Sequence, residues 1–153
     1  MLTEEHKACI GKTSFAWFIY LGGKVKLSRK LLTVLWTRWV ERRGDFLIRS
    51  DLVSFTTLDV CVVLGLRIGG CMVDRRRESQ DSRIRRLFPS WHVYVKMIFY
   101  ELEKCWNDIN VDKFSKLYIL LGFNEFLLPN VKGTIFGGLF SIVDELGELC
   151  NYN

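Results

Sequence analysis

The sequence lacks a long apolar run and has few prolines. Its apolar runs, Phe15–Leu21, Val60–Leu64 and Leu117–Leu121, are far shorter than the roughly 18 residues that a membrane span needs. With 2 prolines, 49% hydrophobic residues and 25% charged residues, the composition is globular and not disordered. The first seven residues, MLTEEHK, lack the basic start of a secretory signal. We therefore expect a soluble, intracellular protein without a membrane segment.

Histidine is scarce, and the cysteines form no recognisable motif. The 5 cysteines are irregularly spaced and include no C-x-x-C pair, which argues against a disulfide framework and a zinc ribbon. A cysteine hydrolase needs a thiolate beside a base. The only histidines, His6 and His92, have no motif spacing to Cys61, which lies in the apolar run VCVVL. The sequence therefore predicts no catalytic residues, no metal site and no cofactor, and a protein that is not an enzyme.

Positive charge is concentrated in the first half of the chain. Residues 1–86 carry 17 Lys and Arg against 9 Asp and Glu, whereas residues 87–153 carry 5 against 8. The stretch 74–86 is predicted to be a basic loop, and two interpretations are open: it is solvated and partly self-paired, or it binds phosphates or an acidic partner. No aromatic residues alternate with its arginines, so any contact with nucleic acid would be weak and independent of sequence. The candidate binding residues are Arg75, Arg76, Arg77, Arg83, Arg85 and Arg86.

Apolar periodicity predicts a mostly α fold with a small β-hairpin, in the α+β class. Apolar residues recur at helical spacing from Ser28 to about Gly44, and again in residues 91–106, 112–127 and 135–150. Two short apolar runs about a polar turn predict an antiparallel hairpin near residues 46–55. We expect residues 1–153 to form a single compact domain, with a core that includes Trp36, Trp39, Val60, Val63, Leu64, Leu117, Leu121 and Leu139.

The stretch TTLDVCVVLGLRIGG, residues 56–70, contains glycines whose spacing fits neither a dinucleotide fingerprint nor a phosphate-binding P-loop. The pattern instead predicts a short helix, in which Thr56 is the N-cap, Asp59 completes a capping box and Gly65 ends the helix. Further along, Pro129 in the polar stretch 128–133 predicts a turn between the last two helices.

Two parts of this sequence resemble the plant mobile domain family. FTTLDVCVVLGLRIGG is similar to the family's Thr-x-x-Asp-Val start and Leu-Gly-Leu stop, and DKFSKLYILLGFNEFLLPN followed by VDELGELCNYN is similar to its second block. Members, some labelled aminotransferase-like, occur in transposon-encoded proteins and in plant nuclear proteins linked to silencing and genome maintenance. The resemblance implies a transposon-derived, non-catalytic interaction module in the nucleus, with a protein partner and an association with chromatin or nucleic acid.

The resemblance leaves a second role open. Some relatives stand ahead of a ubiquitin-like-protein-specific cysteine protease, so the alternative is an accessory N-terminal domain whose catalytic domain is absent from this chain. The family pattern also predicts a tryptophan just after Asn153 and further helices beyond it. We therefore expect a shortened or fragmentary copy of the domain.

Overall fold

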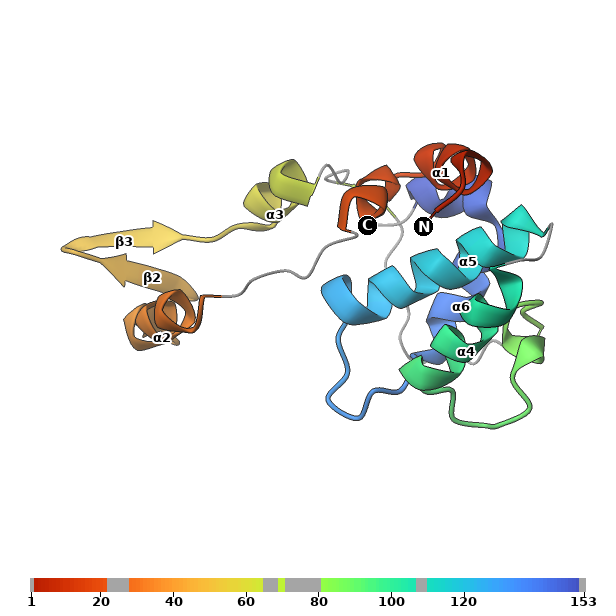
Figure 1. Ribbon diagram of the computed structural model, residues 1–153. Helices are drawn as coiled ribbons and strands as arrows, with labels where there is room; N and C mark the ends of the chain where they lie inside the picture. The colour runs from red at the N-terminus through yellow and green to blue at the C-terminus, as the bar shows by residue number, and fades with distance from the viewer. Residues whose placement is uncertain (1, 22–27, 65–68, 71–80, 107–109, 152–153) are drawn as a thin grey trace.

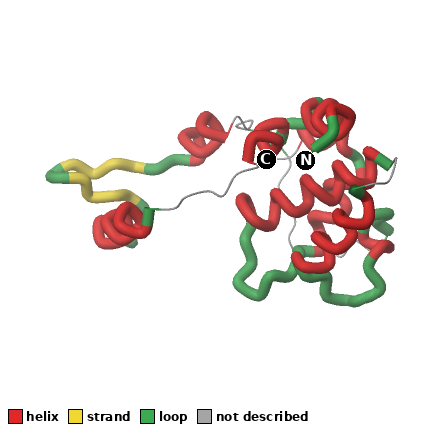
Figure 2. Tube along the Cα trace, in the orientation of Figure 1, coloured by secondary structure: helices red, strands yellow, loops and turns green. Residues whose placement is uncertain are grey.

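The computed structural model describes residues 2–21, 28–64, 69–70, 81–106 and 110–151. Residues 28–64 form a hairpin unit, which lies apart from a helical body made by residues 2–21 and the described residues after 80 (Figure 1). Figure 2 shows that the strands of the sheet lie in the hairpin unit. The described elements are helices apart from three short antiparallel strands, so the predicted mostly α fold with a small hairpin is confirmed.

The helical body is organised around α5, which packs against α1, α4 and α6. Tyr118 of α5 donates its hydroxyl to the carbonyl of Phe18 at 3.0 Å, which fastens the 3-10 segment η1 to the same helix. The elements of the body are α1 (Glu4–Gly11), η1 (Ala16–Leu21), η2 (Arg85–Leu87), α4 (Val95–Cys105), α5 (Val111–Gly122), the π-helical turn η3 (Phe123–Leu127), α6 (Gly137–Asp144) and η4 (Leu146–Asn151).

The predicted core is confirmed where it falls in the helical body. Leu117 and Leu139 are fully buried, and Leu121 is half-buried against the same core. Helix α5 has neighbours on several sides, so apolar side chains around much of its circumference are buried against other helices. This packing makes α5 the central element of the body.

The hairpin unit contains α2 (Arg29–Arg38), β1 (Trp39–Val40), β2 (Asp45–Ile48), β3 (Asp51–Ser54) and α3 (Thr57–Leu64). The strands pair in the order β1-β2-β3, and the predicted hairpin is confirmed by pairs such as Phe46 with Val53. The Ser28 hydroxyl caps α2 by accepting from the amide of Leu31 at 3.3 Å. Helix α2 is shorter than predicted because the chain leaves helical geometry at Trp39 to pair with β2. Gly44, with φ of 70°, belongs to the turn before β2.

Helix α3 confirms the predicted capping box. The Asp59 carboxylate accepts from the amide and the hydroxyl of Thr56, both at 2.7 Å, and the Thr56 hydroxyl accepts from the amide of Asp59 at 3.3 Å. The hydrogen bonds from Thr56 hold the pKa of Asp59 below its usual value. Gly65, the predicted end of this helix, lies outside the described residues.

The predicted core is wrong in the hairpin unit. Trp36 is 81% exposed and Val63 is 78% exposed, while Trp39 is partly exposed and Val60 is half-buried. These residues show the expected spacing, but their unit lies apart from the helical body and is too small to cover their apolar faces (Figure 1). The side chain of Leu64 lies outside the described residues.

The later helices follow the sequence prediction with two differences. Helix α4 begins at Val95 and not near residue 91, and the predicted helix over 135–150 is broken at Glu145, where φ is −113° and ψ is 82°. The turn predicted at Pro129 is confirmed: the amide of Gly133 donates to the carbonyl of Asn130 at 2.8 Å. None of the helices in the described ranges combines the length and apolar character needed to cross a bilayer.

Candidate interaction surface

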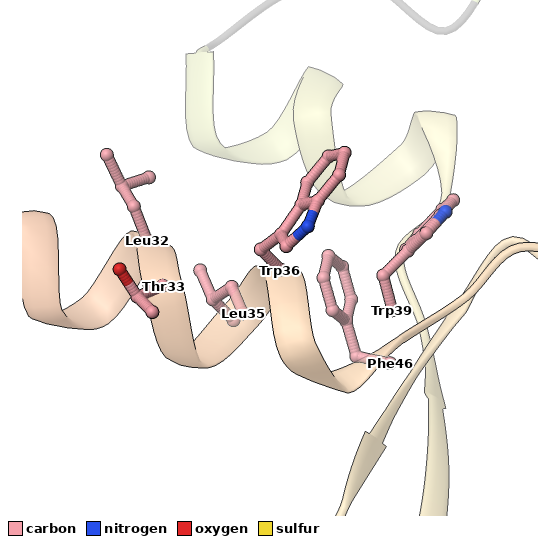
Figure 3. Close-up of a pocket in the computed structure, with 6 residues that line it drawn as sticks. All are labelled: Leu32, Thr33, Leu35, Trp36, Trp39 and Phe46. Carbon is pink, nitrogen blue, oxygen red and sulfur yellow. The ribbon is translucent and has the colours of Figure 1, made fainter.

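An apolar groove of about 580 Å³ opens on the hairpin unit, between α2 and the first two strands (Figure 3). In this view the side chains of Leu32, Trp36 and Trp39 rise on the same side of the ribbon, and the ring of Phe46 lies between the two indoles. The Trp39 and Phe46 rings are 5.0 Å apart between centroids. The groove is lined by Leu32, Thr33, Leu35, Trp36, Trp39 and Phe46.

Local structure explains why these side chains meet. Leu32 and Trp36 are four residues apart on α2, so they lie on the same helical face. Trp39 leaves the helix and pairs with Phe46 across β1 and β2, which brings the second strand beside the end of that face. Thr33 donates its hydroxyl to the carbonyl of Arg29 at 2.9 Å, so its polar atom is satisfied within the helix. The groove therefore offers mainly apolar contacts.

The rest of the hairpin unit is also rich in exposed apolar side chains. Among its side chains that the structure describes, Cys61 alone is buried. Apolar patches of this kind on a protein surface are typical of interaction sites. Besides the groove, the exposed large apolar residues of the unit are Leu31, Val34, Leu47, Ile48, Leu52, Val53, Phe55, Leu58, Val62 and Val63.

Cations flank the groove. Arg29 and Lys30 lie in the first turn of α2 and Arg38 lies in its last turn, and all three are exposed. Within the described parts of the chain, none of the three has a carboxylate oxygen within 4.0 Å. Helix α2 has no Asp or Glu. The groove is therefore apolar inside and positively charged at both ends.

The arginines predicted to bind phosphates fall into three groups. Arg75, Arg76 and Arg77 lie outside the described residues. Arg83 and Arg86 are exposed, and Arg86 Nη2 lies 3.8 Å from the carboxylate of Asp81. Arg85 is different, since its guanidinium is used within the fold. It donates to the backbone carbonyls of Phe88, Ser90 and Trp91 at 2.6, 2.7 and 3.0 Å.

The described end of the predicted basic loop is fastened to α6. The carboxylate of Asp144 accepts from the amides of Arg83 and Ile84 at 2.8 and 3.1 Å. Ser82 donates its hydroxyl to the carbonyl of Phe140 at 3.2 Å. The backbone from residue 82 is therefore held by the body, while the side chains of Arg83 and Arg86 face solvent.

The candidate cysteine and histidine residues lie in different parts of the structure. Cys61 is in α3 of the hairpin unit, His6 is in α1, and His92 is exposed before α4. The His6 ring stacks on Phe114 with centroids 4.0 Å apart, and its Nδ1 lies 2.9 Å from the hydroxyl of Thr3. Across the described ranges, no three His, Cys, Asp or Glu side chains are grouped as ligands for a metal ion.

His6 is buried, and its environment favours the neutral imidazole. Its Nε2 atom has no hydrogen-bond partner among the described residues. Burial lowers the pKa of His6, and the nearby charge of Glu5 opposes this effect in part. The side chain therefore contributes to the packing of α1 on α5 in its uncharged form.

Sequence reasoning missed the groove because it placed Trp36 and Trp39 in the core. The signal that was present is the composition of α2, where an apolar face with two nearby tryptophans is flanked by cations and lacks acidic residues. The pairing of Trp39 with Phe46, which completes the groove, has no sequence signature, because β1 is only 2 residues long.

The structure is that of an α+β domain, in which a small antiparallel sheet and two helices lie beside a helical body and carry an apolar groove at the surface. The chain belongs to the family described as Domain of unknown function (DUF8566), whose model matches residues 1–153. No solved structure matches the chain.

The chain is also similar to Protein MAINTENANCE OF MERISTEMS from Arabidopsis thaliana. The two are 30% identical over 81 residues, which is 53% of this chain and 17% of that protein. The similarity supports the resemblance to the plant mobile domain family at a coarse level. The match spans about a sixth of the length of that curated relative.

Proposed function

We propose that this chain is a non-catalytic, transposon-derived interaction module of the nucleus, which binds a protein partner and associates weakly with chromatin or nucleic acid. The observation that carries the proposal is the apolar groove on the hairpin unit, with Trp36 81% exposed at its edge. Burying a large aromatic side chain is strongly favourable in free energy, and tryptophan is enriched among the residues that contribute most to binding energy at interfaces.

The environment of the groove supports a protein partner. Exposing the apolar surface of a tryptophan side chain to water is unfavourable in free energy. A partner that covers Trp36 and Trp39 removes this unfavourable exposure. The groove also has a defined shape, since the paired strands and α2 hold its walls. These properties favour specific binding of one partner over non-specific hydrophobic association.

The separation of Cys61 from His6 supports a non-catalytic role. A nucleophilic cysteine needs a base within hydrogen-bond reach. Cys61 belongs to the hairpin unit, whereas His6 packs its ring on Phe114 in the helical body. The family resemblance supplies no catalytic residues to place at these positions.

The nucleic-acid part of the proposal rests on the excess of Lys and Arg over residues 1–86 and on the exposed Arg83 and Arg86. Contact through Arg75–Arg77, Arg83 and Arg86 would neutralise about three phosphates, so the logarithm of the binding constant should fall with log salt at a slope of about −2.7. Replacing Arg75, Arg76 and Arg77 by alanine should flatten this slope with the melting temperature nearly unchanged. An unchanged slope in fluorescence anisotropy with a DNA duplex would contradict the nucleic-acid role.

The alternative is an accessory domain of a longer protein, including a transposon-encoded ubiquitin-like-protein protease. The observation that favours it is the small share of the curated relative, 17%, that the match covers. The genomic sequence that follows Asn153 separates the two roles. An intact protease reading frame favours the accessory domain, and its absence favours an independent module.

Proximity labelling in plant cells tests the protein-partner role. The chain, fused to a biotin ligase, should lie in the nucleus and label a defined set of proteins. Replacing both Trp36 and Trp39 by serine should remove most of that set. Val62→Ser is the matched control, because Val62 is 71% exposed in the same unit but does not line the groove. An identical set of labelled proteins in all three forms would refute the groove as the interaction site.

A further inference from the structure

We infer that the groove on the hairpin unit receives an acidic amphipathic helix of a partner protein, whose apolar face fills the groove and whose carboxylates meet the cations at its ends. This inference rests on the proposed function, because it names the partner chemistry of the same site. Three observations carry it: the length of the groove, the charges around it and the sign of the charge at the start of α2.

The length of the groove matches the apolar face of a short helix. Its lining runs along α2 from Leu32 to Trp36, a rise of roughly 6 Å at about 1.5 Å per residue, and Trp39 extends it from the start of β1. A partner helix with apolar residues at positions i, i+3 or i+4, and i+7 presents successive anchors for the α2 part of the groove and for Trp39. The volume of about 580 Å³ is filled by a few large side chains, and Leu32 and Leu35 supply aliphatic walls for them.

The charges select an acidic partner. Residues 28–43 contain five cations, Arg29, Lys30, Arg38, Arg42 and Arg43, and one acidic residue, Glu41. All five cations are exposed. None has a carboxylate oxygen within 4.0 Å in the described parts of the chain. Their positive potential therefore faces solvent, and complementary charge on a partner speeds association and selects against basic partners.

The helix dipole at the first turn of α2 also favours a negatively charged partner. The start of a helix carries partial positive charge, so acidic side chains are favoured there and cations are not. Helix α2 has Arg29 and Lys30 in this turn and no acidic residue. A carboxylate from a partner at this end would interact favourably with both cations and with the helix dipole.

Two other occupants fit less well. A second copy of this chain that presented the same groove would bring two identical sets of cations together, which is unfavourable in a symmetric contact. A nucleic acid would stack bases on Trp36 and place phosphates on the cations, but it would leave the aliphatic walls formed by Leu32 and Leu35 without an apolar partner.

The test uses the full chain and three fluorescein-labelled helical peptides, with binding measured by fluorescence anisotropy. The first peptide has Leu and Phe at the anchor positions and Glu on its flanks. The second keeps the anchors with Lys on its flanks, and the third keeps Glu with Ser at the anchors. We expect the first peptide to bind at least tenfold more tightly than either of the others, because both the anchors and the charges contribute.

Variants assign the contact to the groove. Trp36→Ala should weaken binding of the first peptide by at least tenfold, while Val62→Ser should bind it as the unchanged chain does. The double variant Lys30→Glu with Arg38→Glu should reverse the preference between the Glu and Lys peptides. Both changed positions are exposed, and circular dichroism checks that each variant keeps the fold.

Each other outcome overturns the inference in a recognisable way. Equal or tighter binding of the Lys peptide, lost in Trp36→Ala, rejects the acidic partner and leaves the groove as an interaction site. A DNA duplex or single-stranded oligonucleotide that displaces the first peptide through the same groove residues assigns the groove to nucleic acid. A dimer in sedimentation velocity that Trp36→Ala dissolves assigns it to a second copy. No peptide binding, together with unchanged proximity labelling, rejects both the inference and the proposed protein-partner role.

Discussion

Replacing Leu117 by alanine should destabilise the protein far more than replacing the larger Trp36. Leu117 is fully buried in α5, among the contacts with α1, α4 and α6. The change removes three buried carbon atoms at about 0.8 kcal/mol each. The cavity left behind adds to this, so the free energy of unfolding should fall by roughly 2–5 kcal/mol.

Trp36 has the larger side chain but is 81% exposed. Its replacement by alanine should therefore change the free energy of unfolding by no more than about 0.5 kcal/mol. In a chain of this size each kcal/mol corresponds to about 2–4 °C, so Leu117→Ala should melt roughly 4–20 °C below the unchanged chain. Trp36→Ala should melt within about 2 °C of it.

Thermal and urea unfolding, both followed by circular dichroism at 222 nm, measure the two effects. Val63→Ala is a second control, because Val63 is 78% exposed in the hairpin unit. Equal losses for Trp36→Ala and Leu117→Ala would show that Trp36 belongs to a shared core and would refute the separate placement of the hairpin unit. A melting temperature for Leu117→Ala within 2 °C of the unchanged chain would refute the central role of α5.

Two further predictions concern the helical body. Gly122→Ala should destabilise the protein by roughly 1–3 kcal/mol, because a Cβ at this position would overlap the ring of Phe18. Gly11→Ala is the control: Gly11 has open space around it in α1, so this change should be neutral or stabilise the protein by up to about 1 kcal/mol. Equal changes in the free energy of unfolding for Gly122→Ala and Gly11→Ala, measured by urea unfolding, would contradict the packing of η1 on α5. For His6, burial lowers the pKa in the folded state, so the unfolded chain binds the proton first as pH falls below about 6.5. Stability should therefore be constant above this pH, fall between it and the lowered folded pKa, and level off below. His6→Phe should lose this component in urea unfolding at pH 7.5 to 5, and an unchanged pH dependence would contradict the buried neutral imidazole.

Local features of this fold were predictable because they depend on neighbours in the chain. The capping box of Thr56 and Asp59, the hairpin near residues 46–55 and the turn at Pro129 all follow from side chains that act within a few residues. The helical periods were equally visible. The end of α2 was not predictable, because Trp39 pairs with Phe46 in the sheet and therefore does not continue the helix.

The candidate site was only partly predictable for the same reason. Sequence identified Arg83, Arg85 and Arg86 as one basic group, whereas the fold separates them by use. The Arg85 guanidinium holds the backbone up to Trp91, and Asp144, about 60 residues away, fixes the amide of Arg83. The groove escaped prediction because it depends on a strand of 2 residues.

The sequence by itself determined local features such as the α3 capping box, the hairpin near residues 46–55 and the turn at Pro129, since capping, periodicity and turn chemistry are encoded within short stretches. Only the tertiary structure decided which apolar faces leave water. Leu117 and Trp36 both belong to helices whose apolar residues recur at helical spacing, yet Leu117 is fully buried and Trp36 is 81% exposed. Burial depends on whether another element arrives to cover a face. In this protein α1, α4 and α6 cover α5, while the groove on α2 stays open to solvent.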